Sequence, residues 1–302
     1  MKRKWFFFLI LPLAYIWVKN TSLPGKLPQG CFQECAVNSR EEDRDIIIIS
    51  LNMLHGFPKF NSLASRLEIL ADELIDLNAD IVMLQEVPWT FKTGNGAEFL
   101  AKRLGMNYEY LRANGNRWTI GFEEGEAILS RYPLTEIGFI ELDPKADIFE
   151  NRIVLSGISN TPIGKINLFV THLTNEDAEI NFRQASSLKK FVEGNNSGFG
   201  VVSGDFNAKP DSSQILGLSS EWIDAISFFD SAENVYTCCI DNLFQQKAIL
   251  SKRIDYIFLP QPPSSDLIVR TQKVFEQSFP NENGWLWVSD HVGLLLKLTS
   301  VD

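Results

Sequence analysis

The chain has 302 residues, and its 38 acidic side chains outnumber its 28 basic ones, so its formal net charge is −10. Its composition, 45% hydrophobic and 22% charged, is that of a globular protein and excludes a disordered or low-complexity chain. The acidic balance argues against a protein that bulk charge holds on nucleic acid or anionic lipid, although a local basic groove is still compatible with it. The length allows one large domain or two small ones.

The N-terminus is basic and then strongly apolar. Lys2, Arg3 and Lys4 precede an apolar run over residues 5–18, which is the order found in a secretory signal. As a helix this run would reach about 21 Å, short of a hydrocarbon core of roughly 30 Å. Pro12 also weakens a straight spanning helix.

Three interpretations of residues 1–20 stay open: a cleaved export signal, an uncleaved membrane anchor and a buried core segment. Trp5, Tyr15 and Trp17 suit a membrane interface, whereas no small-residue cleavage motif follows the apolar run. We expect the protein to be exported, or anchored through residues 5–18, with its folded domain outside the cytoplasm.

The rest of the chain divides into a linker and one domain. Pro, Gly, Gln and Asn are frequent in residues 21–44, a composition typical of linkers. Residues 45–302 show no change of composition that would mark a boundary, so a single folded domain is expected there.

Four cysteines are too few for a disulfide scaffold, and none belongs to a CxxC zinc pattern. The spacing of Cys31 and Cys35 allows them to pair but does not show that they do. The adjacent Cys238 and Cys239 are interpreted as packing residues.

Hydrophobic periodicity predicts the elements of this domain in chain order. A β-branched run predicts a strand over residues 46–53, and leucines at three- and four-residue steps predict a helix over 62–77. Further predicted elements are strand 81–87, helix 97–104, strands 107–112, 126–130, 137–142, 153–158 and 165–172, helix 178–192, and strands 200–203, 254–259, 267–270 and 292–298. The excess of strands suggests an α+β body of two sheets with helices outside.

Polar residues recur at or near the ends of these apolar runs. They are Asn52, Glu86, His172, Asp205, Asn207, Asp255, Asp290 and His291. A carboxylate inside an apolar run costs several kcal/mol unless a donor, a cation or a proton accompanies it. The repetition suggests that these residues converge on one charged site.

The chemistry of this set favours a hard cation. Oxygen ligands from Asp, Glu and Asn suit Mg²⁺ or Mn²⁺. No cysteine accompanies two of the three histidines, so a zinc site is less favoured. The sequence contains no GxxxxGK[ST] or GxGxxG nucleotide loop and no GxSxG acyl-hydrolase motif.

Seven blocks occur in the order SLNM, LQEV, GEAILSRYPL, FVTHL, GDFNAKP, RIDYIF and SDH. Together they resemble the endonuclease/exonuclease/phosphatase superfamily, which includes pancreatic deoxyribonuclease, abasic-site endonucleases, inositol polyphosphate phosphatases and neutral sphingomyelinases. The resemblance covers residues 46–298. It implies a four-layer α/β/β/α sandwich with two packed mixed sheets, and a catalytic site at one edge of the paired sheets.

The resemblance also implies roles for matching residues. Glu86 would be the principal Mg²⁺ ligand, with Asn52 and Asp290 in the same metal shell. Asp205 would orient or deprotonate the attacking water, and Asn207 would hold that water or a phosphate oxygen.

Four further positions complete the implied site. Asp255 would accept a hydrogen bond from His291 and fix its tautomer and orientation. His172 would contact the phosphate or assist the leaving group. Arg152, in ENRIVL, matches a weaker basic position and would either neutralise phosphate charge or form an ordinary ion pair. The implied reaction is in-line attack of water on phosphorus with Mg²⁺ as cofactor, Mn²⁺ being an alternative.

The resemblance leaves the substrate open, because function lies in the loops around a shared core. A lipid head group is favoured by the N-terminal segment, which would contact a membrane, and by Trp89, Phe91, Trp118, Trp285 and Trp287. An exported nuclease acting on DNA or RNA would need a local basic rim, for which the candidates are Lys59, Lys92, Lys102, Arg103, Arg112 and Arg117.

A third alternative is a catalytically silent, membrane-tethered binding module.

His55 is interpreted as a loop residue that reaches toward the substrate. We expect a metal-dependent hydrolase of phosphoric esters that acts as a monomer, with no protein partner.

Overall fold

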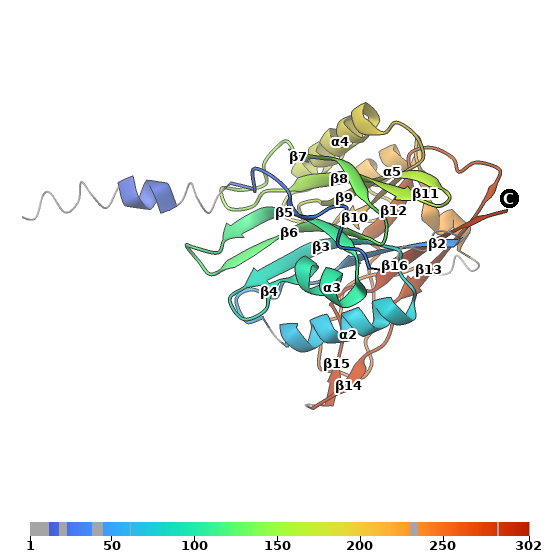
Figure 1. Cartoon of the computed structure of the whole chain (residues 1–302). Helices are drawn as coiled ribbons and strands as arrows, with labels where there is room; N and C mark the ends of the chain where they lie inside the picture. Colours follow the sequence, from blue (N-terminus) through green and yellow to red (C-terminus); the bar gives the residue numbers. More distant parts are fainter. Residues whose placement is uncertain are drawn as a thin grey trace, which may run out of the picture.

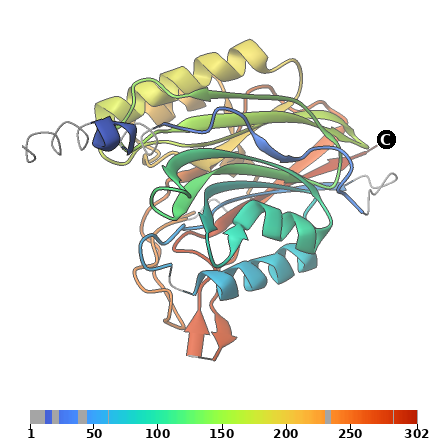
Figure 2. The same ribbon diagram turned by 60° about the vertical axis from the view of Figure 1, so that its left-hand side comes forward.

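The computed structural model describes residues 12–17, 23–37, 45–60, 62–229, 235–282 and 284–301. Two large mixed sheets lie face to face, and helices cover their outer faces (Figures 1 and 2). The expected α+β fold, a four-layer α/β/β/α sandwich, is therefore confirmed.

The first sheet has the strand order β1-β5-β6-β3-β2-β16-β13, and β4 pairs with β3. Its strands are β1 (Gln29–Cys31), β2 (Asp45–Asn52), β3 (Ile81–Thr90), β4 (Gly94–Asn95), β5 (Asn107–Asn116), β6 (Phe122–Ser130), β13 (Leu267–Val274) and β16 (Gly293–Ser300). Helices α2 (Leu63–Asp76) and α3 (Gly96–Leu104) cover its outer face. The Asn95 side chain begins α3 by accepting hydrogen bonds from the N–H groups of Ala97 and Glu98.

The second sheet has the order β11-β12-β10-β9-β8-β7. Its strands are β7 (Leu134–Glu141), β8 (Ile153–Thr161), β9 (Gly164–His172), β10 (Gly200–Asp205), β11 (Ile223–Asp224) and β12 (Asp255–Leu259). Helices α4 (Ala178–Asn195) and α5 (Ser213–Ser219) cover this sheet, and a 3₁₀ turn (Ala225–Phe228) follows β11. A hairpin of β14 (Phe279–Asn281) and β15 (Gly284–Leu286) projects beside α2 (Figure 1).

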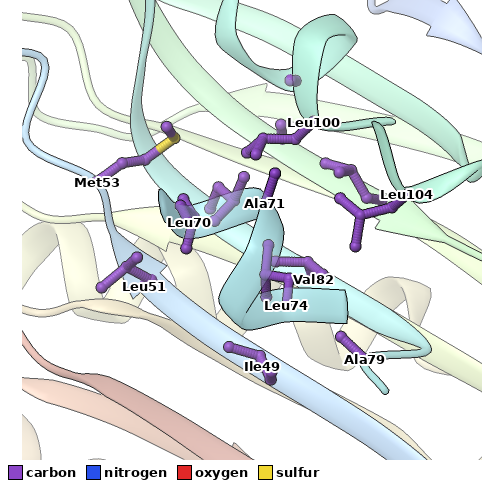
Figure 3. Close-up of a cluster of buried hydrophobic side chains, with 14 of the residues drawn as sticks. Ile49, Leu51, Met53, Leu70, Ala71, Leu74, Ala79, Val82, Leu100 and Leu104 are labelled. Carbon is purple, nitrogen blue, oxygen red and sulfur yellow. The ribbon is translucent and has the colours of Figure 1, made fainter. Parts of the chain in front are cut away.

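The β-branched run of β2 is apolar on both faces because β2 lies inside the sandwich. Ile46 and Ile48 point into the core between the two sheets. Ile49 and Leu51 point the other way, toward the α2 leucines that include Leu70 (Figure 3). The alternation of side chains along a strand thus gives each layer of the sandwich its own core.

The predicted linker over residues 21–44 is wrong in part. Residues 29–31 form β1, which pairs antiparallel with β5. The backbone N–H of Leu134 donates to the carbonyl of Phe32, and the Asn107 side chain accepts from the N–H groups of Cys35 and Ala36. The folded body therefore begins before Asp45. Three residues are too few for hydrophobic periodicity to reveal a strand.

The predicted N-terminal segment is described only over residues 12–17, which are helical. Residues 1–11 and 18–22 lie outside the described residues. Among the helices that the structure describes, none is both long and apolar enough to cross a membrane.

Glu109 of β5 is completely buried between the sheets. Among the described residues, neither of its carboxylate oxygens has a hydrogen-bond partner. Burial raises the pKa of Glu109 well above its usual range. An acid with a raised folded-state pKa favours folding at low pH, and this contribution is lost as the pH rises through the folded-state value.

We therefore predict that Glu109→Gln stabilises the protein at neutral pH. The free energy of unfolding of the variant, relative to the parent, should increase from about pH 5 to about pH 8 and exceed about 1 kcal/mol, the equivalent of roughly one pKa unit. Urea titrations at both pH values measure this difference. Glu141→Gln, at an exposed position of β7, is the control, and an equal effect of both variants would contradict the prediction.

Candidate active site

The predicted site residues meet at one edge of the two sheets. The parallel strands β2 and β3 place Asn52 and Glu86 there, and the parallel strands β9 and β10 place His172 and Asp205 beside each other. Three antiparallel strands begin at the same edge, so residues at or just before their first positions join the group. These residues are Arg152 before β8, Asp255 at the start of β12, and Asp290 and His291 before β16.

Glu86 reaches this edge through a backbone irregularity. The pairing of β3 with β6 shifts register between Leu84 and Val87, and Glu86 has a φ of 53°. A bulge of this kind re-aims one side chain, and a positive φ at a non-glycine residue is a strain that clusters at functional sites.

The Glu86 carboxylate is held by two donors. It accepts from the Asn52 side-chain amide at 3.1 Å and from the His55 backbone N–H at 3.0 Å. Burial opposes its ionisation, but His55, His172 and these hydrogen bonds outweigh burial and lower the pKa of Glu86 to about 2.

Asp205 lies at the centre of the site. Its Oδ2 accepts from Asn52 Nδ2 at 3.0 Å and lies 3.6 Å from His172 Nε2 and 3.8 Å from His291 Nε2. Its Oδ1 accepts from the Asn207 backbone N–H at 2.9 Å. Burial, and then the nearby charge of Asp255, raise the pKa of Asp205 to about 7. A carboxyl with such a pKa can take up and release a proton near neutral pH.

His291 is paired with Asp255. The His291 Nδ1 lies 2.9 Å and 3.1 Å from the two Asp255 oxygens, which directs Nε2 toward Asp205. Burial works against the charged imidazole, but the Asp255 carboxylate outweighs it and raises the pKa of His291 well above its usual range. The buried Ser289 holds this turn in place, because its hydroxyl donates to the Asn52 carbonyl at 2.6 Å.

His172 has the opposite electrostatic character. Burial, aided by the charge of Arg152, lowers the pKa of His172 well below its usual range. Its Nε2 lies 2.9 Å from Asn207 Nδ2, which also donates to the Leu173 carbonyl. The site therefore contains one imidazole that favours the charged form and one that favours the neutral form.

The donor set fits a hard divalent cation. Glu86, Asn52 and Asp290 offer oxygen atoms at one edge, and the Glu86 charge adds to burial in raising the pKa of Asp290. The buried carboxylates Asp205 and Asp255 add further negative charge, so a bound cation would relieve repulsion among acids that are already desolvated.

These residues surround a pocket of about 580 Å³. All the predicted site residues line it except Asn52 and Asp255, which hydrogen-bond to residues that do. Arg152 lines the pocket while its guanidinium pairs with Glu150 at 2.7 Å. A larger hollow of about 780 Å³ on β13 and β16 contains none of these residues, so volume alone does not identify the site.

His55, interpreted from the sequence as a loop residue that reaches toward the substrate, lines the pocket, and its Nε2 lies 3.5 Å from the Glu86 carboxylate. Sequence reasoning missed other residues that support the pocket, since Lys209 and Lys252 also line it. The buried Arg66 donates to the carbonyls of Met53, Leu54 and Val288, which joins the loop after β2 to the loop before β16. A basic residue on the apolar face of α2 is the sequence feature that could have indicated a buried, hydrogen-bonded Arg66.

A family model described as the endonuclease/exonuclease/phosphatase family matches residues 49–291. The chain belongs to the endonuclease/exonuclease/phosphatase family. Members of this family are phosphoester hydrolases that use divalent metals, and the chain is an enzyme of this type. The resemblance drawn from the seven sequence blocks is thereby confirmed. No curated protein matches the chain significantly in sequence.

Solved structures share the family fold at low sequence identity. A mannosyl-6-phosphatase from Bacteroides thetaiotaomicron matches with a TM-score of 0.67 and 18% identity, over 84% of this chain and 99% of its own. A family protein from the same organism gives 0.66 and 17%, over 85% and 98%. Truncated TDP2 from Caenorhabditis elegans gives 0.63 and 17%, also over 85% and 98%. At these identities the structural likeness shows the fold alone.

The Asp255–His291 pair yields a prediction. Asp255→Asn keeps the side-chain shape but removes the charge that orients the His291 imidazole and favours its protonation. We expect kcat/KM to fall by roughly 10²–10⁴-fold, the usual contribution of acid–base catalysis, with the thermal unfolding midpoint little changed. Asp72→Asn, in an exposed ion pair of α2, should leave both quantities unchanged. Activity near the parental level in Asp255→Asn would show that the pair does not act in the reaction.

Proposed function

We propose that the protein is a Mg²⁺-dependent phosphodiesterase that hydrolyses a lipid head group by direct attack of water on phosphorus. The observation that carries the reaction is the position of Asp205, whose Oδ2 faces the Nε2 atoms of both His172 and His291 within 4 Å. A base, a neutral imidazole and a cationic imidazole thus surround one small volume.

The side chains divide the chemistry among them. Asp205 accepts the proton of the attacking water, which its pKa of about 7 permits. Asn207 and His172 hold the water or a phosphate oxygen. His291, kept cationic by Asp255, donates to the oxygen on which charge develops, and Arg152 adds positive charge from the pocket wall.

Glu86, Asn52 and Asp290 are the residues proposed to hold Mg²⁺, with Mn²⁺ as an alternative ion. When bound there, the ion would offset negative charge on the phosphate and on the leaving oxygen. The low pKa of Glu86, about 2, keeps this ligand ionised over the whole physiological range.

Aromatic side chains beside the pocket support a lipid substrate. Phe91 and Trp118 are 75% and 85% exposed, although exposed aromatic groups usually occur only singly on a soluble surface. Phe91 belongs to a rim of side chains that contact one another, and Trp118 follows Arg117 of that rim in the sequence. His55 and Phe57 contact the Phe122 ring, with centroids 5.1 Å and 4.7 Å apart.

The rim continues away from His55 along two loops. Phe91 packs over Gly121 and lies edge-on to Trp89, with centroids 5.1 Å apart, and the Arg117 guanidinium covers the Trp89 ring at 4.8 Å. Trp287 does not take part, because its side chain is buried in a separate cluster. The burial of Trp287 removes it from the aromatic residues that favour a lipid substrate.

The candidate basic rim for a nuclease is largely neutralised. Lys102 pairs with Glu98, and Arg103 pairs with Glu68 and Asp72. Arg112 and Arg117 both pair with Glu123. Cations that are already paired offer less charge to a phosphate backbone, so the lipid alternative is the better supported one.

We further propose that the protein acts outside the cytoplasm as a monomer, exported or anchored through residues 5–18. The structure pairs Cys31 with Cys35 and Cys238 with Cys239. Disulfides persist in oxidising compartments, which supports export. One chain supplies every proposed site residue, which supports a monomer.

Metal dependence is tested with the full chain and a soluble aryl phosphodiester. EDTA should abolish hydrolysis, and Mg²⁺ or Mn²⁺ should restore it. Glu86→Gln, which keeps the shape but loses the charge, should raise the Mg²⁺ concentration for half-maximal rate at least tenfold. Glu98→Gln, at an exposed ion pair of α3, is the control. Full activity in EDTA would rule out the metal-dependent mechanism.

The substrate is tested by comparing sphingomyelin vesicles, plasmid DNA, RNA and a sugar 6-phosphate. We expect fastest turnover on vesicles. Phe91→Ser/Trp118→Ser should reduce vesicle binding more than tenfold, since burying one large apolar side chain contributes about 1.5–3 kcal/mol, while hydrolysis of the soluble diester is retained. Leu216→Ser, at an exposed position of α5, should leave vesicle binding unchanged. Cleavage of nucleic acid alone would refute the lipid proposal.

A further inference from the structure

Two adjacent cysteines stand in the wall of the active-site pocket. Cys238 is buried and Cys239 is partly exposed, and both line the pocket together with Lys252 and His291. They are joined to each other as a disulfide. None of the roles proposed above uses them.

Backbone hydrogen bonds hold this segment from both sides. Cys238 donates to the Lys252 carbonyl at 3.0 Å, and its own carbonyl accepts from the N–H of Lys252 at 2.8 Å. On the other side, Ile240 donates to the Asp290 carbonyl and Val292 donates to the Thr237 carbonyl, each at 2.8 Å. None of these bonds involves sulfur, so the cysteines stay beside His291 when their disulfide is reduced.

The side chains have the spacing of a metal site. One ligand atom each from Cys238, Cys239 and His291 lie within 4.8 Å of one another. Two thiolates and an imidazole are ligands that Zn²⁺ prefers, with bonds of about 2.3 Å to sulfur and about 2.0–2.1 Å to nitrogen. This set differs in kind from the oxygen donors Glu86, Asn52 and Asp290, which suit a hard cation.

We propose that Cys238, Cys239 and His291 form a redox-gated binding site for a thiophilic cation of the Zn²⁺ class. In the oxidised protein the two sulfurs are bonded to each other and neither is a thiolate. A dithiol reductant transfers two electrons and two protons to the disulfide, which becomes two thiols while the reductant closes to its own disulfide. The cation then displaces the two thiol protons and the proton on the His291 ring nitrogen that binds it, and a water or substrate oxygen completes its coordination.

Occupation of this site would inhibit the enzyme. A cation bound to His291 fixes the imidazole and prevents it from donating to the substrate, a consequence that rests on the proposed function. The cation binding itself does not rest on it. The protein would thus be active when oxidised and sensitive to thiophilic metals when reduced.

The test measures metal binding and inhibition on the full chain. Oxidised and dithiol-reduced protein, freed of reductant, is titrated with Cd²⁺, whose thiolate bonds give an ultraviolet charge-transfer band, and with Zn²⁺ in a calorimeter. We expect one thiolate-bound Cd²⁺ or Zn²⁺ ion per reduced chain. The oxidised chain should bind no ion through sulfur. Zn²⁺ should inhibit the reduced enzyme, assayed in Mg²⁺, at a concentration at least tenfold lower than it inhibits the oxidised enzyme.

Two serine pairs separate this site from the rest of the molecule. Cys31→Ser/Cys35→Ser removes the other disulfide, so that every thiol released on reduction comes from Cys238 and Cys239, and it should bind as the parent does. Cys238→Ser/Cys239→Ser should lose the Cd²⁺ band and the redox dependence of inhibition. If that variant fails to fold, as judged by circular dichroism, Cys239→Ser alone should weaken Cd²⁺ binding at least tenfold.

The outcomes are distinct. Equal Zn²⁺ or Cd²⁺ binding by reduced parent and reduced, folded Cys238→Ser/Cys239→Ser would overturn the proposal, as would an absence of the Cd²⁺ band in the reduced parent. A protein that binds the ion as expected but hydrolyses no phosphodiester would refute the proposed function and leave this site standing.

Discussion

Buried negative charge at the common edge of the two sheets is the constraint on which the site depends. Glu86, Asp205, Asp255 and Asp290 are gathered there, and a desolvated carboxylate must have a donor, a proton or a cation. The structure provides each of these in turn. Asn52 and a backbone N–H stabilise ionised Glu86, His291 stabilises Asp255, and a pKa of about 7 leaves Asp205 partly protonated at neutral pH. The charge that remains defines where a divalent cation would be held, and the pocket thus combines acid–base groups with a site for a cation, as phosphoester hydrolysis requires.

The turn around His291 connects this charge to the rest of the fold. The Ser289 hydroxyl donates to the end of β2, and the segment that contains Cys238 bonds to Lys252, just before β12, and to the turn before β16. A change in this segment therefore reaches the Asp255–His291 pair directly. The same arrangement places the Cys238–Cys239 disulfide on one side of His291 and the oxygen atoms of the proposed Mg²⁺ ligands near the other. Under the two proposals, a hard and a thiophilic cation would act on the same imidazole from different sides.

Substrate choice rests on the loops rather than on this edge. The loop after β2 and the ends of β3 and β6 carry the aromatic rim that includes Phe57, Trp89, Phe91 and Phe122, and Glu123 neutralises two arginines nearby. The rim is thus rich in apolar surface, and its two arginines are already paired with an acid, a combination that suits a lipid surface more than a polyanion. The acidic net charge of the chain agrees with that balance.

Local periodicity in the sequence determined most of the regular elements. The β-branched run from Ile46 indicates a buried strand, and the three- and four-residue spacing of leucines in α2 indicates a helix with one buried face. The ordered blocks also identified the family and named the residues that meet at the edge. Tertiary structure alone decided the rest. β1 becomes a strand only through pairing with β5, and Glu86 turns into the site only through a register shift against β6. The burial of Trp287 and the position of Cys238 beside His291 likewise depend on segments far apart in the chain. Such contacts leave no pattern in a short stretch of sequence, since each is set by the long-range pairing of backbones rather than by the neighbours of the residue itself.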